Sequence, residues 1–521
     1  MITIIFTILL SGSVSAANYT VGPNSTHDYA SINQAVSSSA AGDSITVYSN
    51  NNNPYIENVN IGKNLTIKAN GTVTVQSINP GNVVFNINSG GSGTTIQGFT
   101  ITGATTSIGI YLNEVNNCKI LNNKIINCNN GISAYHSNNN QIIGNTITNT
   151  GTGYAYGIYI DGSSNKISGN KINLTGTGIG DTRGIHVWGN SHEISKNTVN
   201  ISSSGTGGSY GIILNNDINS NPGHHHIISG NTISTTSSAG SNDAIDFSSA
   251  FSNNAYGNTV LSGSIKNTGD DNHLNFNRII GSVTIINYID EEFDSLYNWY
   301  GSNAGPGNIF HGNNISYNPW LVMNLISPSQ MNTGSSIIIK ADFTRDSNGG
   351  VHNPSLGHLQ DGIKVLFTTK IGTITTHAYT VNGVAQATLK SGIIYGTNSI
   401  SAELNNQKIQ KSVKIIDKVR PKVTYTYPKN KATKVSRVKT IYLKFSEKIK
   451  ASINWSKITV KNKYGKKIKI YKSINGNTLY IKTGKRIRYS YYTVYIPATA
   501  IKDYSGNSMI KAYTLRFKTG K

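Results

Sequence analysis

The chain has 521 residues, and because single folds usually divide beyond roughly 250 to 300 residues, several domains are expected. Charged residues make up 13% and hydrophobic residues 37%, and the 53 glycines accompany abundant Asn, Ser and Thr, a composition typical of short strands and turns that argues against a helical enzyme. The net charge of +22 is uneven, because residues 417–521 carry 27 Lys and Arg against three acids and therefore form a separate basic module.

The chain begins with an apolar run from Ile2 to Leu10, followed by the small-residue pattern Val14-Ser15-Ala16 of a secretory cleavage site. We therefore predict a signal peptide over residues 1–17, cleaved after Ala16 or Ala17, and a secreted mature chain. A buried N-terminal strand is the alternative. The run is shorter than the roughly 20 apolar residues of a membrane-spanning helix, and no other segment approaches that length, so no integral membrane segment is expected.

Between this leader and the repeats, Asp28 is placed to cap a short amphipathic helix over residues 29–40, which the strand sequence GDSITVYS follows. Together they are expected to cover the open end of a solenoid. Cys118 and Cys128 are the only cysteines. Two small core residues are the preferred interpretation, with a disulfide between them as the alternative.

A repeat dominates the next part of the chain. Asn recurs in similar short segments at spacings of 22, 25, 27, 34 and 27 residues, at Asn123, Asn145, Asn170, Asn197, Asn231 and Asn258. A second, alternating block lies between these, beginning at Gly109, Gly131, Gly157, Gly184, Gly211 and Ala244. Stacked coils would bury one face of each block and leave Asn free to form a side-chain ladder at a turn. The repeat predicts a right-handed parallel β-helix.

The outward residues of the second block form two rows. The first row is Tyr111, Ser133, Tyr159, His186, Ile213 and Asp246, and the second is Asn113, Tyr135, Asp161, Trp188, Asn215 and Ser248. The residues predicted to bind a glycan are Tyr135, Tyr159, Asp161, His186, Trp188 and Asn215. Their aromatic rings can stack on sugars and their polar groups can form hydrogen bonds. The alternative is an ordinary exposed sheet with lateral aromatic stacking.

Candidate catalytic groups are sparse. A glycosidase needs two carboxyl groups roughly 5 to 9.5 Å apart. Asp161 and Asp246 are three coils apart, which at about 4.8 Å per coil is roughly 14 Å. Asp181 with Arg183, and the segment 270–273 with two Asp and His273, leave a polysaccharide lyase or glycoside hydrolase as the alternative function. No catalytic residue is assigned.

A metal site is also not predicted. His224-His225-His226 would place two imidazoles on one face of an extended segment, where they could bind a divalent metal. Because no third ligand is evident, a polar loop is the preferred interpretation, and no metal or other cofactor is expected.

The segments from about Thr94 to Ile315 resemble the β-helix repeats of surface proteins and carbohydrate-active enzymes. NWYGSNAGP at 298–306 and NPW at 318–320 resemble a linker of adhesin-like surface proteins of methanogenic archaea, where it closes the β-helix. Residues 321–416 resemble invasin-type immunoglobulin-like repeats through the turns Asp361-Gly362, Gly372, Gly383-Val384-Ala385 and Asn406-Gln407.

Residues 417–521 resemble the immunoglobulin-like domain of surface-layer proteins through PKVTYTYPKNKATKV, Phe445-Ser446-Glu447 and KDYSGN, although Lys431 stands where that family usually has Gly. The resemblance implies an all-β chain in which a β-helix with its cap, 18–320, is followed by two immunoglobulin-like β-sandwich domains, 321–416 and 417–521. It also implies a cell-surface protein of adhesin-like character.

In the basic domain, Tyr442, Lys444, Tyr480 and Lys482 alternate with apolar residues and are expected to face outward. Lysines on exposed strands can simply discourage aggregation, or the face can dock on an anionic wall polymer. Nucleic acid is not an expected partner, because the chain is predicted to be secreted. The expected partner is a surface glycan or cell-wall polymer, and a purely structural wall component is a third possibility.

Overall fold

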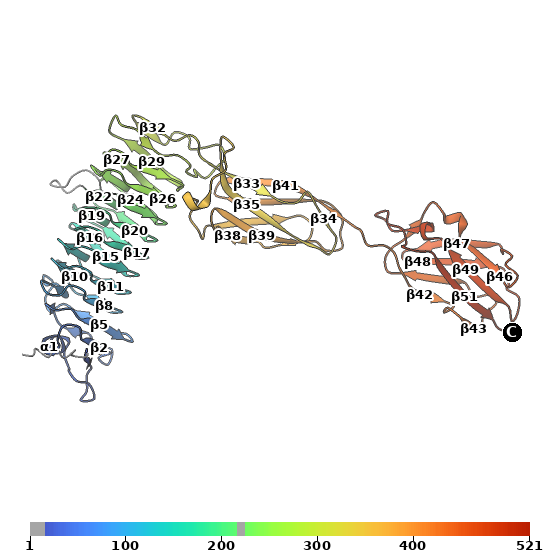
Figure 1. Cartoon of the computed structure of the whole chain (residues 1–521), viewed down its shortest axis with the longest axis horizontal. Coiled ribbons are helices and arrows are strands. Elements are labelled where there is room, and N and C mark those ends of the chain that lie inside the picture. Colours follow the sequence, from blue (N-terminus) through green and yellow to red (C-terminus); the bar gives the residue numbers. More distant parts are fainter. Residues whose placement is uncertain (1–15, 216–224) are drawn as a thin grey trace, which may run out of the picture.

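A computed structural model describes residues 16–215 and 225–521. The predicted leader therefore lies almost entirely outside the described residues, as does His224. The predicted fold class is confirmed, because long parallel sheets are followed by two antiparallel sandwiches (Figure 1). None of the described helices is long and apolar enough to cross a membrane.

The solenoid has three parallel faces. The first is the ladder β1 (Asn18–Val21), β2 (Ser44–Tyr48), β5 (Thr66–Asn70), β8 (Thr95–Gln97), β11 (Lys119–Leu121), β14 (Gln141–Ile143), β17 (Lys166–Ser168), β20 (Glu193–Ser195), β23 (Ile227–Ser229), β26 (Asn254–Tyr256), β28 (His273–Asn275), β30 (Phe293–Asp294) and β32 (Ile315–Ser316). The second is β3 (Tyr55–Ile56), β6 (Thr74–Gln76), β9 (Thr100–Thr102), β12 (Lys124–Ile126), β15 (Thr146–Gly151), β18 (Lys171–Gly176), β21 (Thr198–Ser203) and β24 (Thr232–Ser237).

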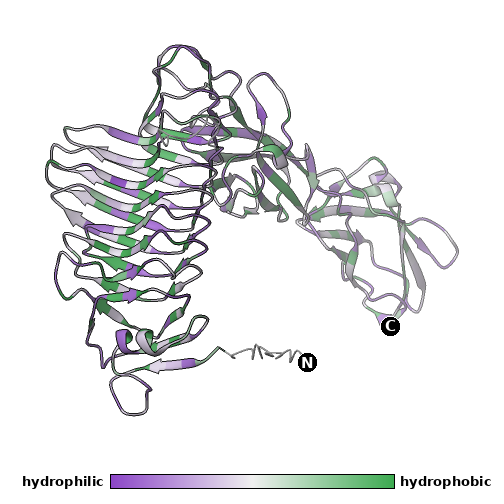
Figure 2. Ribbon diagram, turned by 60° about the vertical axis from the view of Figure 1, so that its left-hand side comes forward, coloured by the Kyte–Doolittle hydropathy of each residue, from purple (hydrophilic) through white to green (hydrophobic). Residues whose placement is uncertain are grey.

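The third face carries the outward rows. It consists of β4 (Val59–Ile61), β7 (Phe85–Ile87), β10 (Ile108–Asn113), β13 (Asn130–Tyr135), β16 (Ala155–Asp161), β19 (Thr182–Trp188), β22 (Ser209–Asn215), β25 (Asn242–Ser248) and β31 (Phe310–Gly312). Two long strands, β27 (Thr259–Asn267) and β29 (Arg278–Asn287), continue both the second and third faces. Inward residues of successive coils line up as continuous apolar stripes (Figure 2), as the alternation predicted.

The recurrent Asn residues form a buried hydrogen-bonded ladder. In each coil the Oδ1 atom accepts the backbone N–H of the corresponding Asn one coil earlier, for example Asn170 N to Asn197 Oδ1 at 2.9 Å. The amide of Asn197 also donates to Ile167 O at 2.9 Å and to Asn231 Oδ1 at 3.0 Å. Each Asn therefore satisfies buried backbone groups of neighbouring coils, which apolar side chains cannot do.

The cap helix is α1 (Ile32–Ser38), and its N-cap is Ser31. The carboxylate of Glu57 accepts hydrogen bonds from the first N–H groups of the helix. Asp28 instead accepts a hydrogen bond from Thr20, so its predicted capping role was wrong. Glu57 lies too far along the chain for a local pattern to reveal it.

Cys118 and Cys128 are unpaired and buried, which agrees with the core interpretation.

The first sandwich packs directly on the last coils. Its sheets are β33 (Leu321–Ile326), β35 (Ser336–Asp346), β39 (Val384–Lys390) and β37 (Thr373–Ile374), and β34 (Gln330–Asn332), β41 (Gln407–Ile416), β40 (Gly396–Leu404), β36 (Lys364–Thr369) and β38 (His377–Tyr379), with a 3₁₀ turn at Pro354–Leu356. Trp299 of the solenoid belongs to this core, and its Nε1 donates to Asn405 Oδ1 at 3.0 Å. Solenoid and first sandwich therefore share packing and hydrogen bonds.

The second sandwich has a separate core and follows after a connecting segment (Figure 1). Its sheets are β42 (Val423–Tyr427), β44 (Ile441–Phe445), β48 (Thr478–Thr483) and β47 (Ile470–Asn475), and β43 (Ala432–Val435), β51 (Tyr513–Thr519), β49 (Tyr491–Ile496) and β46 (Thr459–Asn462); β45 (Lys450–Ala451) pairs with β50 (Ile501–Lys502), and 3₁₀ turns lie at Trp455–Lys457 and Ala498–Ala500.

The Asn ladder gives a first prediction. Asn197→Ala removes the acceptor of the buried Asn170 N–H, so we expect the free energy of unfolding to fall by about 2–3 kcal/mol. Urea unfolding followed by circular dichroism measures this effect. Asn200→Ala is the matched control, because Asn200 is exposed on the same coil, and it should change stability by less than about 0.5 kcal/mol. Equal losses in both variants would show that the ladder is not a special source of stability.

A second prediction concerns Lys431, whose φ of 64° lies in the left-handed region that favours glycine. Lys431→Gly should therefore raise the stability of the second sandwich by about 0.5–1 kcal/mol. The measurement is the midpoint of its calorimetric transition. Lys429→Gly removes the same charge at a neighbouring residue without a positive φ and should lower the midpoint. A loss in both variants would contradict the role of strain.

Candidate functional site

The third face of the solenoid brings the two predicted rows together. Strand pairing aligns Tyr111, Ser133, Tyr159, His186, Ile213 and Asp246, and it aligns Asn113 with Tyr135 and Asp161 with Trp188, Asn215 and Ser248. Because a parallel coil returns to the same position every turn, the repeat alone was enough to predict this register.

The predicted binding residues differ in exposure. Tyr135 is 41% exposed, whereas His186 is only 5% exposed. Tyr159, Asp161, Trp188 and Asn215 are intermediate. Burial, with a smaller contribution from the positive charge of Arg183, lowers the pKa of His186 to about 3, so its imidazole is neutral at physiological pH. His186 is therefore placed beneath the surface.

Around His186 the rings form a cluster. Its ring lies 5.8 Å from Tyr156 in a stacked arrangement, 5.6 Å from Tyr159 edge to face, and 5.7 Å from Trp188, measured between centroids. Neither nitrogen of His186, nor Nε1 of Trp188, has a hydrogen-bond partner within the described parts of the chain. The part of the two outward rows around His186 therefore matches lateral aromatic packing, which is the alternative interpretation of the sequence.

A third outward row, which the sequence interpretation did not include, runs beside the first two. It aligns the half-buried Asn130, Tyr156, Arg183 and Tyr210 and continues to Asp243, which is buried. The Arg183 guanidinium donates to Tyr156 Oη at 2.6 Å and to Asp181 Oδ2 at 2.8 Å, and it lies within 5.8 Å of the ring centroids of Tyr154, Tyr156 and Tyr210. The available signal was the residue before each recurrent Gly, where the alternation of buried and exposed residues breaks.

The part of the outward rows around Tyr135 encloses a shallow cavity of about 320 Å³. Its lining residues are Ile108, Tyr111, Asn130, Ser133, Tyr135, Tyr156 and Tyr159. Burial, reinforced by the charge of Asp161, raises the pKa of Tyr159 to about 12, and burial also raises the pKa of Tyr111. Both phenols therefore remain protonated and can donate and accept hydrogen bonds. Four rings around polar groups create an amphipathic hollow.

The carboxyl groups considered for catalysis are dispersed. Asp161 pairs with His136 Nδ1 at 3.2 Å, and Asp181 pairs with Arg183. Asp271 and Asp294 flank His273 at 3.3 and 2.8 Å, where β28 lies on the first face of the solenoid. These clusters are thus on different faces and do not form one site.

Both carboxyl groups of β25, Asp243 and Asp246, have raised pKa values. Burial, together with the nearby charge of Asp243, raises the pKa of Asp246 to about 6. Lys266 Nζ lies 2.7 Å from Asp243 Oδ2 and is the residue paired with Asp246 on the next coil. Asp246 can therefore exchange a proton near neutral pH. Asp243 and Lys266 form an ion pair with each other, so Lys266 only partly offsets the charge of Asp246.

A cleft at the junction of two domains was not predicted from the sequence. It has a volume of about 860 Å³ and lies where the first face of the solenoid meets the first sandwich, lined by Lys196, Ile227 and Tyr256 on one side and Leu356, His358 and Asp361 on the other. The cleft depends on contacts between distant parts of the chain, such as Gln360 Nε2 donating to Gly230 O at 2.6 Å. Repeat spacing carries no information about such contacts.

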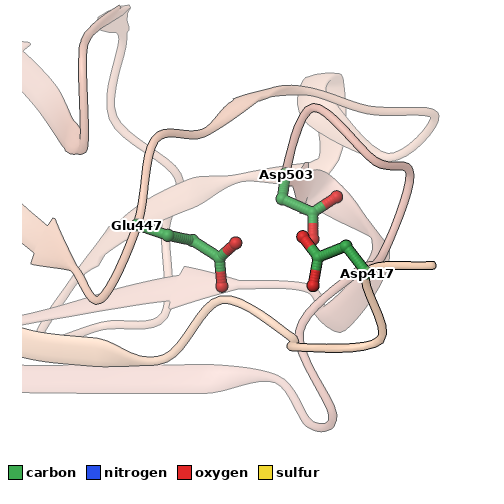
Figure 3. Close-up of side chains that lie close together, drawn as sticks. All are labelled: Asp417, Glu447 and Asp503. Carbon is green, nitrogen blue, oxygen red and sulfur yellow. The ribbon is translucent and has the colours of Figure 1, made fainter. Parts of the chain in front are cut away.

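The only acids of the basic domain, Asp417, Glu447 and Asp503, converge (Figure 3). One carboxylate oxygen of each lies within 4.8 Å of the others. Asp503 is buried and accepts from Asn507, and Asp417 Oδ2 accepts from Ser505 Oγ at 3.0 Å. Hard oxygen donors of this kind are those that Ca²⁺ or Mg²⁺ prefers. The signal in the sequence was their isolation among 27 basic residues.

Glu447 of this cluster has a raised pKa. Burial, followed by the charges of Asp503 and Asp417, raises its pKa to about 7, from an ordinary value of 4.5. Its Oε1 atom is enclosed and has no hydrogen-bond partner among the residues described by the structure. The folded state therefore favours the protonated acid.

This shift gives a third prediction. Because the folded-state pKa is raised, ionisation of Glu447 costs stability as pH rises from about 4.5 through 7. Glu447→Gln should match the wild type near pH 4 and exceed it by about 1–2 kcal/mol at pH 8, after discounting for solvent screening. Calorimetry at both pH values measures the difference. Glu403→Gln, at an exposed ion pair with Lys408, is the control and should show no such trend. A constant offset for Glu447→Gln would contradict the shifted pKa.

The fold and these sites define a modular protein in which a β-helix precedes immunoglobulin-like domains. Residues 16–210 are similar to the family described as periplasmic copper-binding protein (NosD), and residues 417–519 are similar to the bacterial Ig-like domain family Big_5. A search of curated protein sequences finds no match.

Several solved structures have distant similarity. The Yersinia pseudotuberculosis adhesin InvE is 16% identical, with a TM-score of 0.24 over 38% of this chain and 58% of that one. The Escherichia coli adhesin FdeC is 12% identical, with a TM-score of 0.20 over 39% and 67%, and titin domains I67–I69 are 9% identical, with a TM-score of 0.23 over 40% and 67%. This chain thus spans only 58% of the InvE structure. These similarities carry no functional information.

Proposed function

We propose that this chain is a secreted, adhesin-like protein of the cell surface that binds glycans through the third face of its β-helix and attaches to a wall polymer through its basic C-terminal domain. The observation that carries the first part is the hollow formed by Tyr111, Tyr135, Tyr156 and Tyr159. Aromatic faces beside fixed polar groups are the combination that sugar rings require, because one side of a sugar is apolar and its rim is polar.

The six residues that the sequence predicts to bind a glycan have different roles in this proposal. Tyr135 and Tyr159 form the contact surface, and Asp161, held by His136, accepts sugar hydroxyls at its edge. His186 lies beneath and positions the rings of Tyr159 and Trp188. Trp188 and Asn215 extend this contact surface along the next two coils. Because His186 is buried beneath these rings, we expect the binding surface to be rigid rather than flexible.

Copper binding, which the NosD description suggests, does not fit these residues. Within the part of the chain that the structure describes, three potential ligands converge only at the acidic cluster, which lies outside residues 16–210 and offers oxygen atoms alone. Copper favours imidazole and sulfur ligands. Burial raises the pKa of both Cys118 and Cys128 to about 11, so these thiols remain protonated.

An extracellular polysaccharide lyase or hydrolase on the same face is the second candidate, favoured by the near-neutral pKa of Asp246. The charges that act on the pKa of Asp246 are those of Asp243 and Lys266, which form an ion pair with each other. Release of reducing ends or unsaturated products from acidic polysaccharides would support this candidate over simple binding. Loss of that activity in Asp246→Asn would assign it to this carboxyl group.

A glycan array probed with the full chain tests the proposed site. Tyr135→Ala and Tyr159→Ala each remove a ring from the hollow, so we expect affinity for the bound glycans to fall at least about tenfold, or 1.4 kcal/mol. Tyr288→Ala, which removes a ring that is 60% exposed outside the hollow, should leave binding unchanged. Retained binding in both hollow variants would move the site elsewhere, and an array with no bound glycan would reject the proposal.

A further inference from the structure

A row of tyrosines crosses the outer face of one sheet in the second sandwich. Tyr427 of β42, Tyr442 of β44 and Tyr480 of β48 are directly paired across the strands. Their ring centroids are 5.7 and 6.0 Å apart, and Tyr425 lies 6.0 Å from Tyr442. The apolar residues that alternate with them, including Leu443 and Ile481, are buried in the core. The row is therefore a continuous, partly exposed aromatic strip.

The strip is bordered by positive charge. Lys444 and Lys482 are exposed and lie two residues from Tyr442 and Tyr480, so they project from the same face. Lys439 Nζ lies 4.5 Å from the ring centroid of Tyr427. Each part of the row thus has an ammonium group beside it.

No acidic residue occurs in any of the four strands of this sheet. The domain carries +24, and its only three acids are gathered in the cluster that includes residues of the connecting segment and the loop before β51 (Figure 3). An approaching anion therefore meets lysines without compensating carboxylates on this face. Such a field attracts polyanions and raises their rate of association.

We infer that this tyrosine row binds a linear polysaccharide whose sugars carry carboxylate groups. Successive sugar rings pack along Tyr427, Tyr442 and Tyr480, and the lysines pair with their carboxylates. A polyanion without rings would use the lysines but leave the aromatic strip uncovered. This inference rests on the proposed attachment role of the domain and names the surface and ligand class that perform it.

The probe for the experiment is sodium polygalacturonate, and the protein is the full chain, studied by isothermal titration calorimetry. Tyr442→Ala with Tyr480→Ala should weaken binding roughly tenfold or more, because two stacked rings are lost. The matched control is Tyr491→Ala with Tyr495→Ala, which removes two exposed rings from β49 of the opposite sheet. The control should bind within about twofold of the wild type, and a loss equal to that of the row variant would overturn the inference.

Phenylalanine variants protect the result against unfolding. Tyr442→Phe with Tyr480→Phe keeps both rings and should retain most of the affinity, and calorimetric melting verifies that the Ala variant is folded. Should the Ala variant unfold, loss of affinity in a folded Lys444→Gln, Lys482→Gln protein, compared with Lys461→Gln, Lys518→Gln, would still locate the ligand. Equal affinity in these two lysine variants would overturn the inference.

Two further probes separate ligand classes. Inorganic polyphosphate and single-stranded DNA should bind more weakly than polygalacturonate, and their affinity should be the same in the wild type and the row variant. Tighter binding of either polyanion, lost in the row variant, would overturn the carboxylate assignment. Co-sedimentation with isolated cell walls distinguishes the two proposals: retention on walls without polygalacturonate binding overturns only this inference, and absence of both rejects the attachment role as well.

Discussion

The solenoid depends on how its buried turns satisfy their backbone groups. Parallel strands pair with neighbouring coils, but a turn inside the stack leaves N–H groups with no strand partner. The Asn ladder supplies an acceptor from the next coil, and it continues past the recognised repeats to Asn277 and Asn298. A second ladder runs alongside, in which Asn165 N donates to His192 Nδ1 at 3.2 Å and His192 N to His226 Nδ1 at 3.0 Å. Thus His226 belongs to a structural ladder.

The sequence predicted those features that a repeating coil determines locally. Strand register, the apolar stripes and the outward rows follow from alternation and spacing, which is why Tyr159 and His186 were aligned correctly. Burial of His186 was not predictable, because it depends on rings contributed by adjacent coils and rows. The role of Arg183 was missed for a related reason: the alternation of inward and outward residues fails at Gly184, since Arg183 is partly exposed whereas Ile185 is buried.

Distant contacts and charge clusters escaped prediction for a different reason. The first turn of α1 is bound by Glu57, 25 residues beyond Ile32, and no local capping pattern contains that information. The acids of the basic domain were evident in the composition, but only the fold brings Asp417, Glu447 and Asp503 within 4.8 Å. Their convergence concentrates negative charge at one point and leaves the tyrosine-bearing sheet uniformly positive.

The two joints of the chain differ in their physical basis. The solenoid and the first sandwich are joined through the buried Trp299, and Asn405 accepts from both Trp299 Nε1 and Arg278 Nε, so the orientation of the third face is fixed by packing. The two sandwiches have separate cores, and polar groups such as Thr333 and Asp417, 3.4 Å apart, connect them. Bending is therefore expected to concentrate at Asp417, where the acidic cluster also lies. Under the proposed function, the C-terminal domain can then adjust to an irregular polymer while the solenoid and first sandwich keep the proposed glycan-binding face rigid.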